Sequence, residues 1–473
     1  MDRFIGRKEE LEILENLYNK QGFQMMVMYG RRRIGKSTLI EKFLEGKKSV
    51  YYVATKEGYN GNINKWIKRI LKELPTDVPG LSLNTADDVV DYLDAKCRSE
   101  RIVIVIDELP YLAESDKGLL SVLQNAIDEK WMKGNMMLIL CGSSVSFMID
   151  EVLSEKSPLF GRRTSQLEVK AFNYIDSAKF VPNYSFEEKA ICYGITGGVA
   201  KYLSFIDNTK TLDENIVSIF FSKGGFLLEE PNNLLVQEYR NVSIYSDIIQ
   251  AMADGANRVN EIADKAHLDV TAVAHALPNL IKTGIVSKDF AITNENNNKK
   301  IQYIISDNMF RFWYRFVAEG LSAIEFSQGK LYYMNNVKPF LHEYMGCVFE
   351  DMCRYYTLYL GVTGKLNSYI STVGKWWGTN PAKKEATDID IVGINKQNKK
   401  AVIGECKFRN TPIDKDVFDA LLDRNGLIDS KYNVCQYILF SLSGFSKWIY
   451  ENTDRNEVML VALEDMYTDI TVQ

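Results

Sequence analysis

The sequence predicts an α/β protein whose N-terminal domain holds a parallel sheet covered by helices. Between residues 1 and 170, apolar strand-like runs alternate with helical patterns, which is typical of a parallel sheet. The strand candidates at 24–30, 49–55, 101–109 and 136–144 are apolar almost throughout, as in strands buried on both faces. In addition, four residues separate Gly30 from Gly35-Lys36-Ser37, which is the spacing of a phosphate-binding loop between a strand and a helix.

The composition predicts a folded chain of two or three domains, because 46% of the 473 residues are hydrophobic and 25% are charged. The N-terminus has no apolar signal core and no run of 18 apolar residues occurs, so we expect a cytoplasmic protein with no membrane partner. The seven cysteines form no CxxC pair and there are only three histidines, so neither a zinc site nor a disulfide framework is expected. The net charge of -5 argues against nonspecific coating of nucleic acid, although it leaves room for a local basic surface.

We predict five parts along the chain. Residues 1–170 form the phosphate-loop core, 171–238 a helical lid, 239–310 a winged helix, 311–336 a linker helix, and 337–473 a separate α/β domain. The winged helix is predicted from three helical patterns followed by two strand-like runs, at 285–292 and 299–306. Its third helix carries only Lys282 and contains Pro278, so it offers few groups that could read bases, and a structural linking role is favoured.

The predicted nucleotide-binding stretch follows the first strand. It consists of Gly30, Arg31, Arg32, Arg33, Ile34, Gly35, Lys36, Ser37 and Thr38. Backbone N–H groups at the helix N-terminus would face phosphates, Lys36 would reach the β- and γ-phosphates of ATP, and Ser37 would ligate Mg²⁺. The alternative is an ordinary glycine-containing turn between a strand and a helix.

Two later strand ends supply polar groups for the same site. Asp107 would complete the Mg²⁺ site, and Glu108 would act as the general base that polarises the attacking water. The alternative for both is a solvated acidic pair. Ser143 or Ser144, in "CGSS", would sense the γ-phosphate, the alternative being a capping or turn serine.

Six segments carry a family resemblance: "FIGRKEELEILENLY", "YGRRRIGKSTLI", "VIVIDELPYL", "LILCGSS", "SPLFGRRT" and "GITGGVAKYL". Over roughly residues 3 to 310 the chain resembles the archaeal-type, AAA-like ATPases of prokaryotes, which are related to the STAND ATPases. The resemblance implies a P-loop NTPase that binds and hydrolyses ATP, with Arg162 or Arg163 near the γ-phosphate. The chain departs from the usual Gly-Gly-x-Pro, because it has Ala200 after Gly197-Gly198-Val199.

A second candidate site lies in "TDIDIVGINKQNKKAVIGECKFRN", residues 387–410. Two apolar strands hold Asp388, Asp390, Glu405 and Lys407, and a hairpin would bring Asp390 beside Glu405. Side chains alternate along a strand, so Glu405 and Lys407 would share one face. The carboxylates of Asp390 and Glu405 could bind Mg²⁺ or Mn²⁺, and Lys407 could stabilise the developing charge in phosphodiester cleavage.

This region resembles the PD-(D/E)xK superfamily, which implies a restriction-endonuclease-like fold over residues 337 to 445. Glu350 matches the helical acid of the superfamily, and "KWWG" at 375–378 also appears in such domains, whereas Ile389 stands where a proline is usual. Residues 361–410 carry nine Lys or Arg against four Asp or Glu, which suits a DNA partner. The alternative is a degenerate structural domain held by ion pairs.

The leading hypothesis is therefore an ATPase coupled to a metal-dependent, DNA-directed nuclease domain. The alternative is a STAND-like regulatory switch whose C-terminal domain is catalytically inactive and binds partners. A homo-oligomer or a partner protein is compatible with either hypothesis. A small-molecule kinase is disfavoured, because Glu108 lies beside Asp107 and two further domains follow the phosphate-loop core.

Overall fold

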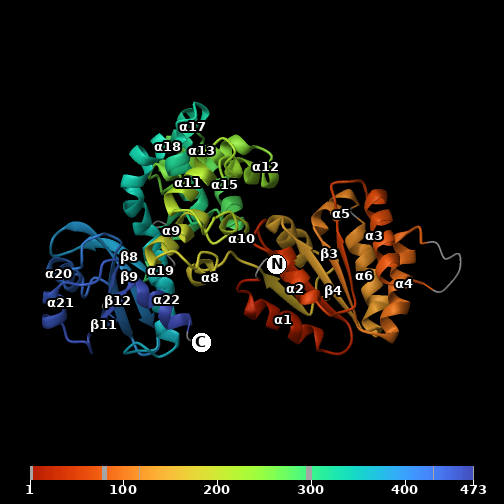
Figure 1. Cartoon of the computed structure of the whole chain (residues 1–473). Helices are drawn as coiled ribbons and strands as arrows, with labels where there is room; N and C mark the ends of the chain where they lie inside the picture. Colours follow the sequence, from red (N-terminus) through yellow and green to blue (C-terminus); the bar gives the residue numbers. More distant parts are fainter. Residues whose placement is uncertain (1–3, 77–82, 117, 294–300, 430, 472–473) are drawn as a thin grey trace. The chain divides into compact units, whose positions relative to one another are not determined.

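The computed structural model describes residues 4–76, 83–116, 118–293, 301–429 and 431–471. It divides into two compact units, of which the first is Met1–Phe172 with Val199–Lys201 and the second is Asn173–Gly198 with Tyr202–Gln473. Figure 1 shows the elements of each unit. No helix among the described residues combines the length and the apolar character needed to cross a membrane.

The first unit is built on a five-stranded sheet in which all paired strands are parallel, with the order β2-β3-β4-β1-β5. The strands are β1 (Gln24–Tyr29), β2 (Ser49–Val53), β3 (Ile102–Asp107), β4 (Met136–Gly142) and β5 (Ser165–Glu168). The longer helices are α1 (Lys8–Tyr18), α2 (Lys36–Leu44), α3 (Tyr59–Glu73), α4 (Ala86–Ser99), α5 (Leu109–Ser115) and α6 (Leu119–Glu129). The predicted parallel sheet is confirmed.

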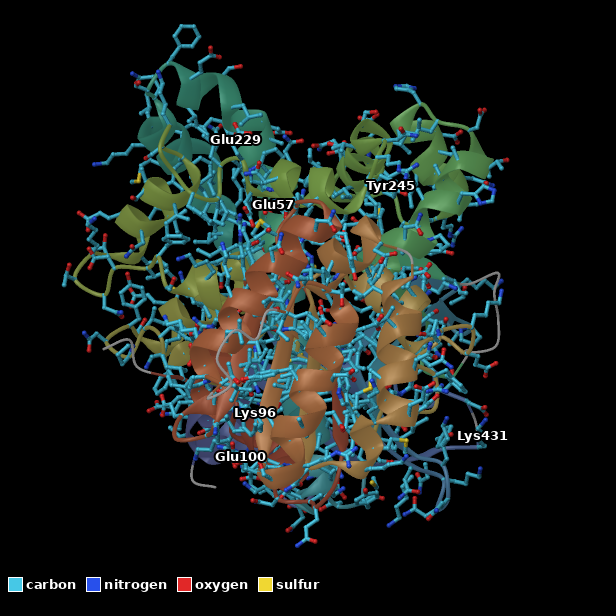
Figure 2. The ribbon with its side chains drawn as sticks, turned by 90° about the vertical axis from the view of Figure 1, so that its right-hand side faces the viewer. Glu57, Lys96, Glu100, Glu229, Tyr245 and Lys431 are labelled. Atoms are coloured by element: carbon cyan, nitrogen blue, oxygen red, sulfur yellow. The ribbon has the colours of Figure 1, made fainter. Side chains whose placement is uncertain are left out.

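Helices cover both faces of this sheet, which explains why its central strands β3 and β4 are buried along their whole length. On one face, alternate strand residues such as Ile104 and Leu138 pack with α3, α4, α5 and α6, and on the other Val105 and Ile139 pack with α1 and α2. Figure 1 shows the sheet between these two helical layers, and Figure 2 shows Lys96 and Glu100 at the end of α4. All parallel strands end at the same sheet edge, where the loops after β1, β3 and β4 meet.

The second unit begins with helices. They are α8 (Tyr174–Ala178), α9 (Phe186–Thr196), α10 (Ala200–Leu203), of which the first two residues belong to the first unit, α11 (Leu212–Phe220) and α12 (Glu230–Glu238). Three helices follow, α13 (Val242–Ala253), α14 (Val259–Ala266) and α15 (Val270–Lys282), and then an antiparallel pair, β6 (Val286–Asp289) and β7 (Gln302–Ile305). Part of the predicted run 299–306 lies outside the described residues. After β7 the chain continues through the helices α16 (Asn308–Phe312), α17 (Ala318–Glu325) and α18 (Gly329–Tyr332).

The C-terminal part holds a second five-stranded sheet, of mixed direction, with the order β12-β11-β10-β9-β8. Its strands are β8 (Thr372–Asn380), β9 (Glu385–Asn395), β10 (Lys400–Lys407), β11 (Asn433–Ser441) and β12 (Val458–Ala462). The helices around it are α19 (Leu341–Val362), α20 (Lys415–Leu422), α21 (Lys447–Asn452) and α22 (Leu463–Thr471). Figure 1 shows α19 and α20 on opposite sides of this sheet.

The segment after β6 packs into this C-terminal sheet. Ala291 and Ile292 are buried in the hydrophobic cluster that includes Trp376 and Ile389. The Ile292 N–H donates to the Lys375 carbonyl at 2.9 Å, and the Lys375 ammonium lies 2.5 Å from an Asp289 carboxylate oxygen. The three-helix segment and the C-terminal sheet therefore share one core within the second unit.

Candidate functional site

The predicted phosphate loop connects β1 to α2, and its two glycines are required by the backbone. Gly30 has a φ of 150°, and a Cβ at this position would lie 2.2 Å from the Val169 carbonyl oxygen. Gly35 has a φ of 94° and precedes the first residue of α2. Side chains at these positions would be strained or would clash, so the spacing read from the sequence has a steric cause.

Lys36 is buried under the loop. Its ammonium group donates to the carbonyls of Gly30 at 2.7 Å and Arg31 at 2.9 Å, and only 6% of the residue is exposed. Burial lowers the pKa of Lys36, although the nearby Cys141, Glu108 and Asp107 oppose this shift. The Lys36 ammonium is therefore a buried cation whose hydrogen bonds go to neutral backbone carbonyls. An anionic ligand such as a phosphate would stabilise its charge.

The loop and the end of β3 converge, as the sequence predicts. The Ser37 hydroxyl donates to Asp107 Oδ2 at 3.0 Å, across 70 residues of sequence. The Tyr51 hydroxyl donates to the same oxygen at 2.7 Å, and the Glu108 N–H donates to Oδ1 at 2.9 Å. The hydroxyl of Ser37 and the carboxylate of Asp107 are hard oxygen donors, so these residues fit Mg²⁺. Tyr51 is not among the site residues predicted from the sequence.

Glu108 lies at the same sheet edge in a strained conformation. Its φ of 53° and ψ of 41° place it in the left-handed region, which a glutamate rarely adopts. Its Oε2 accepts a hydrogen bond from the Ser143 hydroxyl at 2.7 Å, and Ser143 is 2% exposed. Ser144 immediately precedes the short helix α7 (Val145–Phe147). Of the two predicted serines, Ser143 is the one that contacts Glu108. Strained residues cluster at functional sites, which fits a role for Glu108.

Two segments that are remote in sequence contact the loop. Arg7, from the "FIGR" segment, is 7% exposed, donates to the Ile34 carbonyl at 2.9 Å and lies 4.2 Å from the centre of the Phe172 ring. The Lys201 N–H, in the "GGVAKY" turn, donates to the Arg33 carbonyl at 3.1 Å. The turn therefore reaches the phosphate loop although it lacks the usual proline. Both segments carry the family resemblance, but the contacts themselves leave no signal in the sequence.

The arginines have separate partners. Arg32 donates to the Tyr111 hydroxyl, and its guanidinium lies 5.8 Å from the centre of that ring. Arg162 forms a two-point ion pair with Asp128, at 2.8 and 2.6 Å. Arg163 donates to the Leu153 carbonyl at 3.0 Å, and its guanidinium lies 5.8 Å from the centre of the Phe160 ring.

The structure also brings together the predicted C-terminal residues. Antiparallel pairing of β9 with β10 sets Gly404 opposite Ile391, so Asp390 and Glu405 are neighbours. Lys407 Nζ lies 2.7 Å from Glu405 Oε1, so both side chains share one face, and Arg424 pairs with Oε2. Asp390 Oδ2 accepts the Cys406 N–H at 3.0 Å. Glu405 is only 5% exposed, so this is a buried cluster rather than a set of surface ion pairs. Arg424 is not among the site residues predicted from the sequence.

Glu350 on α19 adds a further carboxylate to this cluster. Arg354 connects it to β9, because its Nη1 lies 3.3 Å from Glu350 Oε2 and 3.0 Å from the Asp390 carbonyl. Burial, together with the charges of Glu405 and Glu350, raises the pKa of Asp390 to about 7, and burial also raises the pKa of Glu350. Within the described ranges, no three His, Cys, Asp or Glu side chains are arranged as a ready-made metal site.

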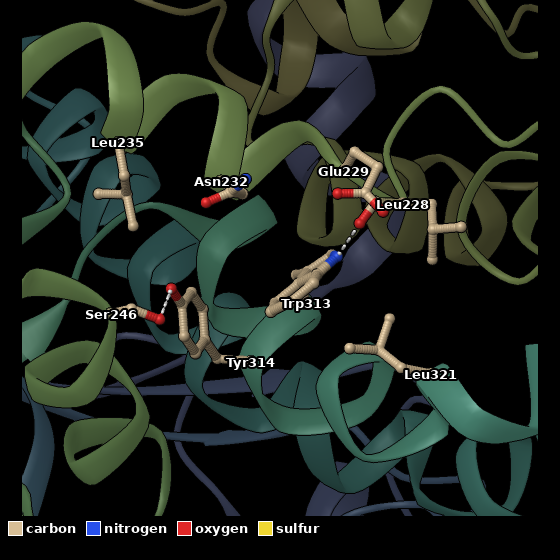
Figure 3. Close-up of a pocket in the computed structure, with 8 residues that line it drawn as sticks. All are labelled: Leu228, Glu229, Asn232, Leu235, Ser246, Trp313, Tyr314 and Leu321. Atoms are coloured by element: carbon tan, nitrogen blue, oxygen red, sulfur yellow. Dashed lines mark hydrogen bonds between the residues drawn. The ribbon is translucent and has the colours of Figure 1, made fainter. Parts of the chain in front are cut away.

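A small cavity of about 250 Å³ lies elsewhere in the second unit, between α12, α13 and the segment around Trp313 (Figure 3). The Trp313 indole N–H donates to the Leu228 carbonyl at 2.8 Å, and the hydroxyls of Tyr314 and Ser246 lie 3.0 Å apart. The polar groups of Trp313, Tyr314 and Ser246 are therefore satisfied within the protein. None of the predicted site residues lines this cavity.

Comparisons with known proteins identify the N-terminal part. Residues 4–206 match the family described as an ATPase domain predominantly from Archaea, and residues 313–419 match a family of archaeal and bacterial proteins of unknown function. An uncharacterized protein of Methanocaldococcus jannaschii is 30% identical over 416 residues, which is 88% of this chain and 89% of that protein. An uncharacterized ATP-binding protein of the same organism is 56% identical over 45 residues, which is 10% of this chain and 76% of that protein.

Among solved structures, a Walker-type ATPase of Pyrococcus abyssi has a TM-score of 0.50 and 20% sequence identity, over 66% of this chain and 96% of that one. At this identity the likeness concerns the fold alone. The family match, however, spans the phosphate loop, the end of β3 and the turn at Val199–Lys201. The chain therefore contains an archaeal-type P-loop ATPase domain over residues 4–206, and as a whole it belongs to the same family as the uncharacterized protein of Methanocaldococcus jannaschii.

Proposed function

We propose that the chain binds ATP with Mg²⁺ at the end of β1 and β3, hydrolyses it, and couples its nucleotide state to metal-dependent cleavage of DNA by the C-terminal α/β domain. The observation that carries the ATPase part is the convergence of Ser37 and Asp107, 3.0 Å apart, beside a buried Lys36. The nuclease part is supported by the buried cluster of Asp390, Glu405 and Lys407.

Each residue of the first site has a separate task. Backbone N–H groups between Gly30 and Ser37 bind the phosphates, and Lys36 exchanges its carbonyl partners for phosphate oxygens. Ser37 and Asp107 would hold Mg²⁺, which neutralises the charge that develops on the phosphates. Glu108 accepts a proton from the attacking water, and Ser143 fixes the orientation of its carboxylate.

Of the two arginines proposed for the γ-phosphate, we favour Arg163. Arg162 is engaged at two points by Asp128, and releasing it would cost both hydrogen bonds. Arg163 donates to the Leu153 backbone carbonyl at 3.0 Å, a contact that leaves its charge available to a phosphate. A guanidinium near the γ-phosphate would stabilise the charge of the transition state.

Two variants test the ATPase proposal. Lys36→Ala should abolish ATP binding, because it removes the buried ammonium group that lies beneath the loop carbonyls of Gly30 and Arg31. Glu108→Gln should retain binding and lower kcat by about 100-fold or more, because the general base is lost. Equal hydrolysis by the wild type and Glu108→Gln would remove Glu108 from this role.

In the C-terminal cluster, Asp390 and Glu405 would hold Mg²⁺ or Mn²⁺, and both offer carboxylate oxygens that suit these ions. Lys407, on the same face as Glu405, would stabilise the charge on the scissile phosphate. The surplus of basic residues between 361 and 410 supports a polyanionic substrate. Glu350, on α19, would add negative charge beside Asp390, to whose backbone carbonyl it is connected by Arg354.

The segment 239–310 would link the two activities as a winged helix that does not read DNA. The hairpin that would serve as its wing is followed by Ala291 and Ile292, which are buried against the C-terminal sheet. The pairing of Asp289 with Lys375 supports the same role. Because Ala291 and Ile292 are buried, the segment directly after β6 is not free to enter a DNA groove.

One observation favours the alternative, a regulatory switch with an inactive C-terminal domain. Both oxygens of Glu405 are already paired, one with Lys407 and one with Arg424, so a metal ion would have to displace a cation. Incubation of the full chain with labelled DNA and Mg²⁺ or Mn²⁺, with and without ATP, separates the two functions. Cleavage that is lost in Lys407→Ala but persists in Lys36→Ala supports the nuclease, whereas no cleavage and no DNA retention in any nucleotide state supports the switch.

A further inference from the structure

We infer that Tyr51 is a positioning residue for the metal–nucleotide site, because its hydroxyl holds the carboxylate of Asp107 in place. The inference rests on the proposed role of Asp107 as a metal-binding residue. Tyr51 lies on β2, outside the phosphate loop and outside the strand that carries Asp107. Its hydroxyl nevertheless lies 2.7 Å from Asp107 Oδ2.

The strand register explains how a tyrosine on β2 reaches this carboxylate. In the parallel pair of β2 and β3, Tyr51 stands opposite Val105, and Val53 stands opposite Asp107. Tyr51 is thus two residues, about 6.6 Å, short of the level of Asp107, on the same sheet face. A long side chain that leans toward the carboxyl end of the strand spans this gap, which a shorter hydroxyl residue such as serine could not do.

The hydrogen bonds around Asp107 show why this contact matters for a metal. Oδ2 accepts from Tyr51 and Ser37, whereas Oδ1 accepts from the Glu108 N–H, and Asp107 is only 3% exposed. A Ser37 oxygen that bound a metal ion through a lone pair would keep its proton for Asp107. Tyr51 and the Glu108 N–H would orient the same carboxylate together with Ser37. Partners of this kind typically contribute 10- to 100-fold to metal affinity.

The chain offers a matched control one residue away. Tyr52 is on the same strand but points to the other sheet face, where its hydroxyl donates to the Asn62 side-chain oxygen at 2.7 Å. Tyr51→Phe and Tyr52→Phe each remove one hydroxyl from β2 and keep the aromatic ring. Only the first removes a hydrogen bond to Asp107.

The test measures Mn²⁺ binding to the full chain by electron paramagnetic resonance, with a non-hydrolysable ATP analogue present. Tyr51→Phe should weaken Mn²⁺ binding by about 10-fold, while Tyr52→Phe stays within about twofold of the wild type. Binding of the analogue in EDTA should be unchanged in both variants, which also confirms that they are folded. In an Asp107→Asn background, Tyr51→Phe should cause no further loss.

Two results would overturn the inference and leave the proposed function intact. In the first, Tyr51→Phe binds Mn²⁺ as tightly as the wild type while Asp107→Asn does not. In the second, both tyrosine variants lose the same affinity, which would indicate a general effect on β2. If Asp107→Asn itself leaves Mn²⁺ binding unchanged, the proposed metal role of Asp107 fails, and this inference fails with it.

Discussion

The Ser143 hydroxyl donates a hydrogen bond of 2.7 Å to Glu108, whose backbone is held in the left-handed region. The two residues follow neighbouring strands, β4 and β3, which pair in parallel. The contact is buried on the Ser143 side, so water competes poorly for it. It fixes the direction of a carboxylate that sits on a strained backbone.

Ser143→Ala should therefore lower kcat for ATP hydrolysis by about tenfold and leave the KM for ATP nearly unchanged, because the change would disorient Glu108, the proposed base, while the loop that is proposed to hold the phosphates stays intact. Steady-state kinetics of the purified chain provide the measurement. Ser144→Ala is the matched control and should behave like the wild type, since Ser144 makes no capping hydrogen bond with its side chain. Equal kinetics for both variants would refute the orienting role.

Gly30→Ala should destabilise the first unit by about 1–3 kcal/mol, because the new methyl group meets the Val169 carbonyl oxygen at 2.2 Å and forces the backbone to shift. Thermal unfolding followed by circular dichroism tests this. Gly58→Ala is the control, since no atom lies within 4 Å of a Cβ at Gly58. A Gly30→Ala variant as stable as Gly58→Ala would show that the backbone at Val169 moves aside at little energetic cost.

Local patterns in the sequence were enough to predict the parallel sheet, the loop from Gly30 to Ser37 and the pairing of Asp390 with Glu405. Each depends on spacing or on strand alternation, which the chain carries within a short segment. The partners Tyr51 and Arg424 could not be predicted, because a tyrosine in an apolar strand and an arginine after a helix look ordinary. Their roles arise only from the register of β2 with β3 and from the position of Arg424 beside Glu405.

Ile292→Ala should lower the stability of the second unit by about 2–5 kcal/mol, because Ile292 is 5% exposed and packs in the core of the C-terminal sheet. Phe290→Ala, two residues earlier and 38% exposed, is the control and should change stability little. Chemical denaturation of the full chain, followed by tryptophan fluorescence, reports both. If the two variants unfold at the same denaturant concentration, the packing of Ile292 does not stabilise the C-terminal sheet.

The stability of the second unit in metal-free buffer should fall as the pH rises from about 4 to about 7, and Asp390 should account for part of this slope. Burial and the neighbouring Glu405 and Glu350 raise the pKa of Asp390 from 3.8 to about 7 in the folded chain. The folded state therefore binds a proton that the unfolded state has already released in this range, so the free energy of unfolding decreases with increasing pH. Asp390→Asn, which carries no titrating group, should flatten the slope.

The measurement is the midpoint of thermal unfolding at pH 5 and pH 7.5 in EDTA, for the wild type, Asp390→Asn and the exposed control Asp388→Asn. The loss of stability between the two pH values should be smaller in Asp390→Asn than in the other two proteins. Added Mn²⁺ should restore wild-type stability at pH 7.5, because at the proposed metal site a divalent cation would take the place of the proton on Asp390. An identical slope in all three proteins would mean that Asp390 ionises normally and that the carboxylates do not act as a pair.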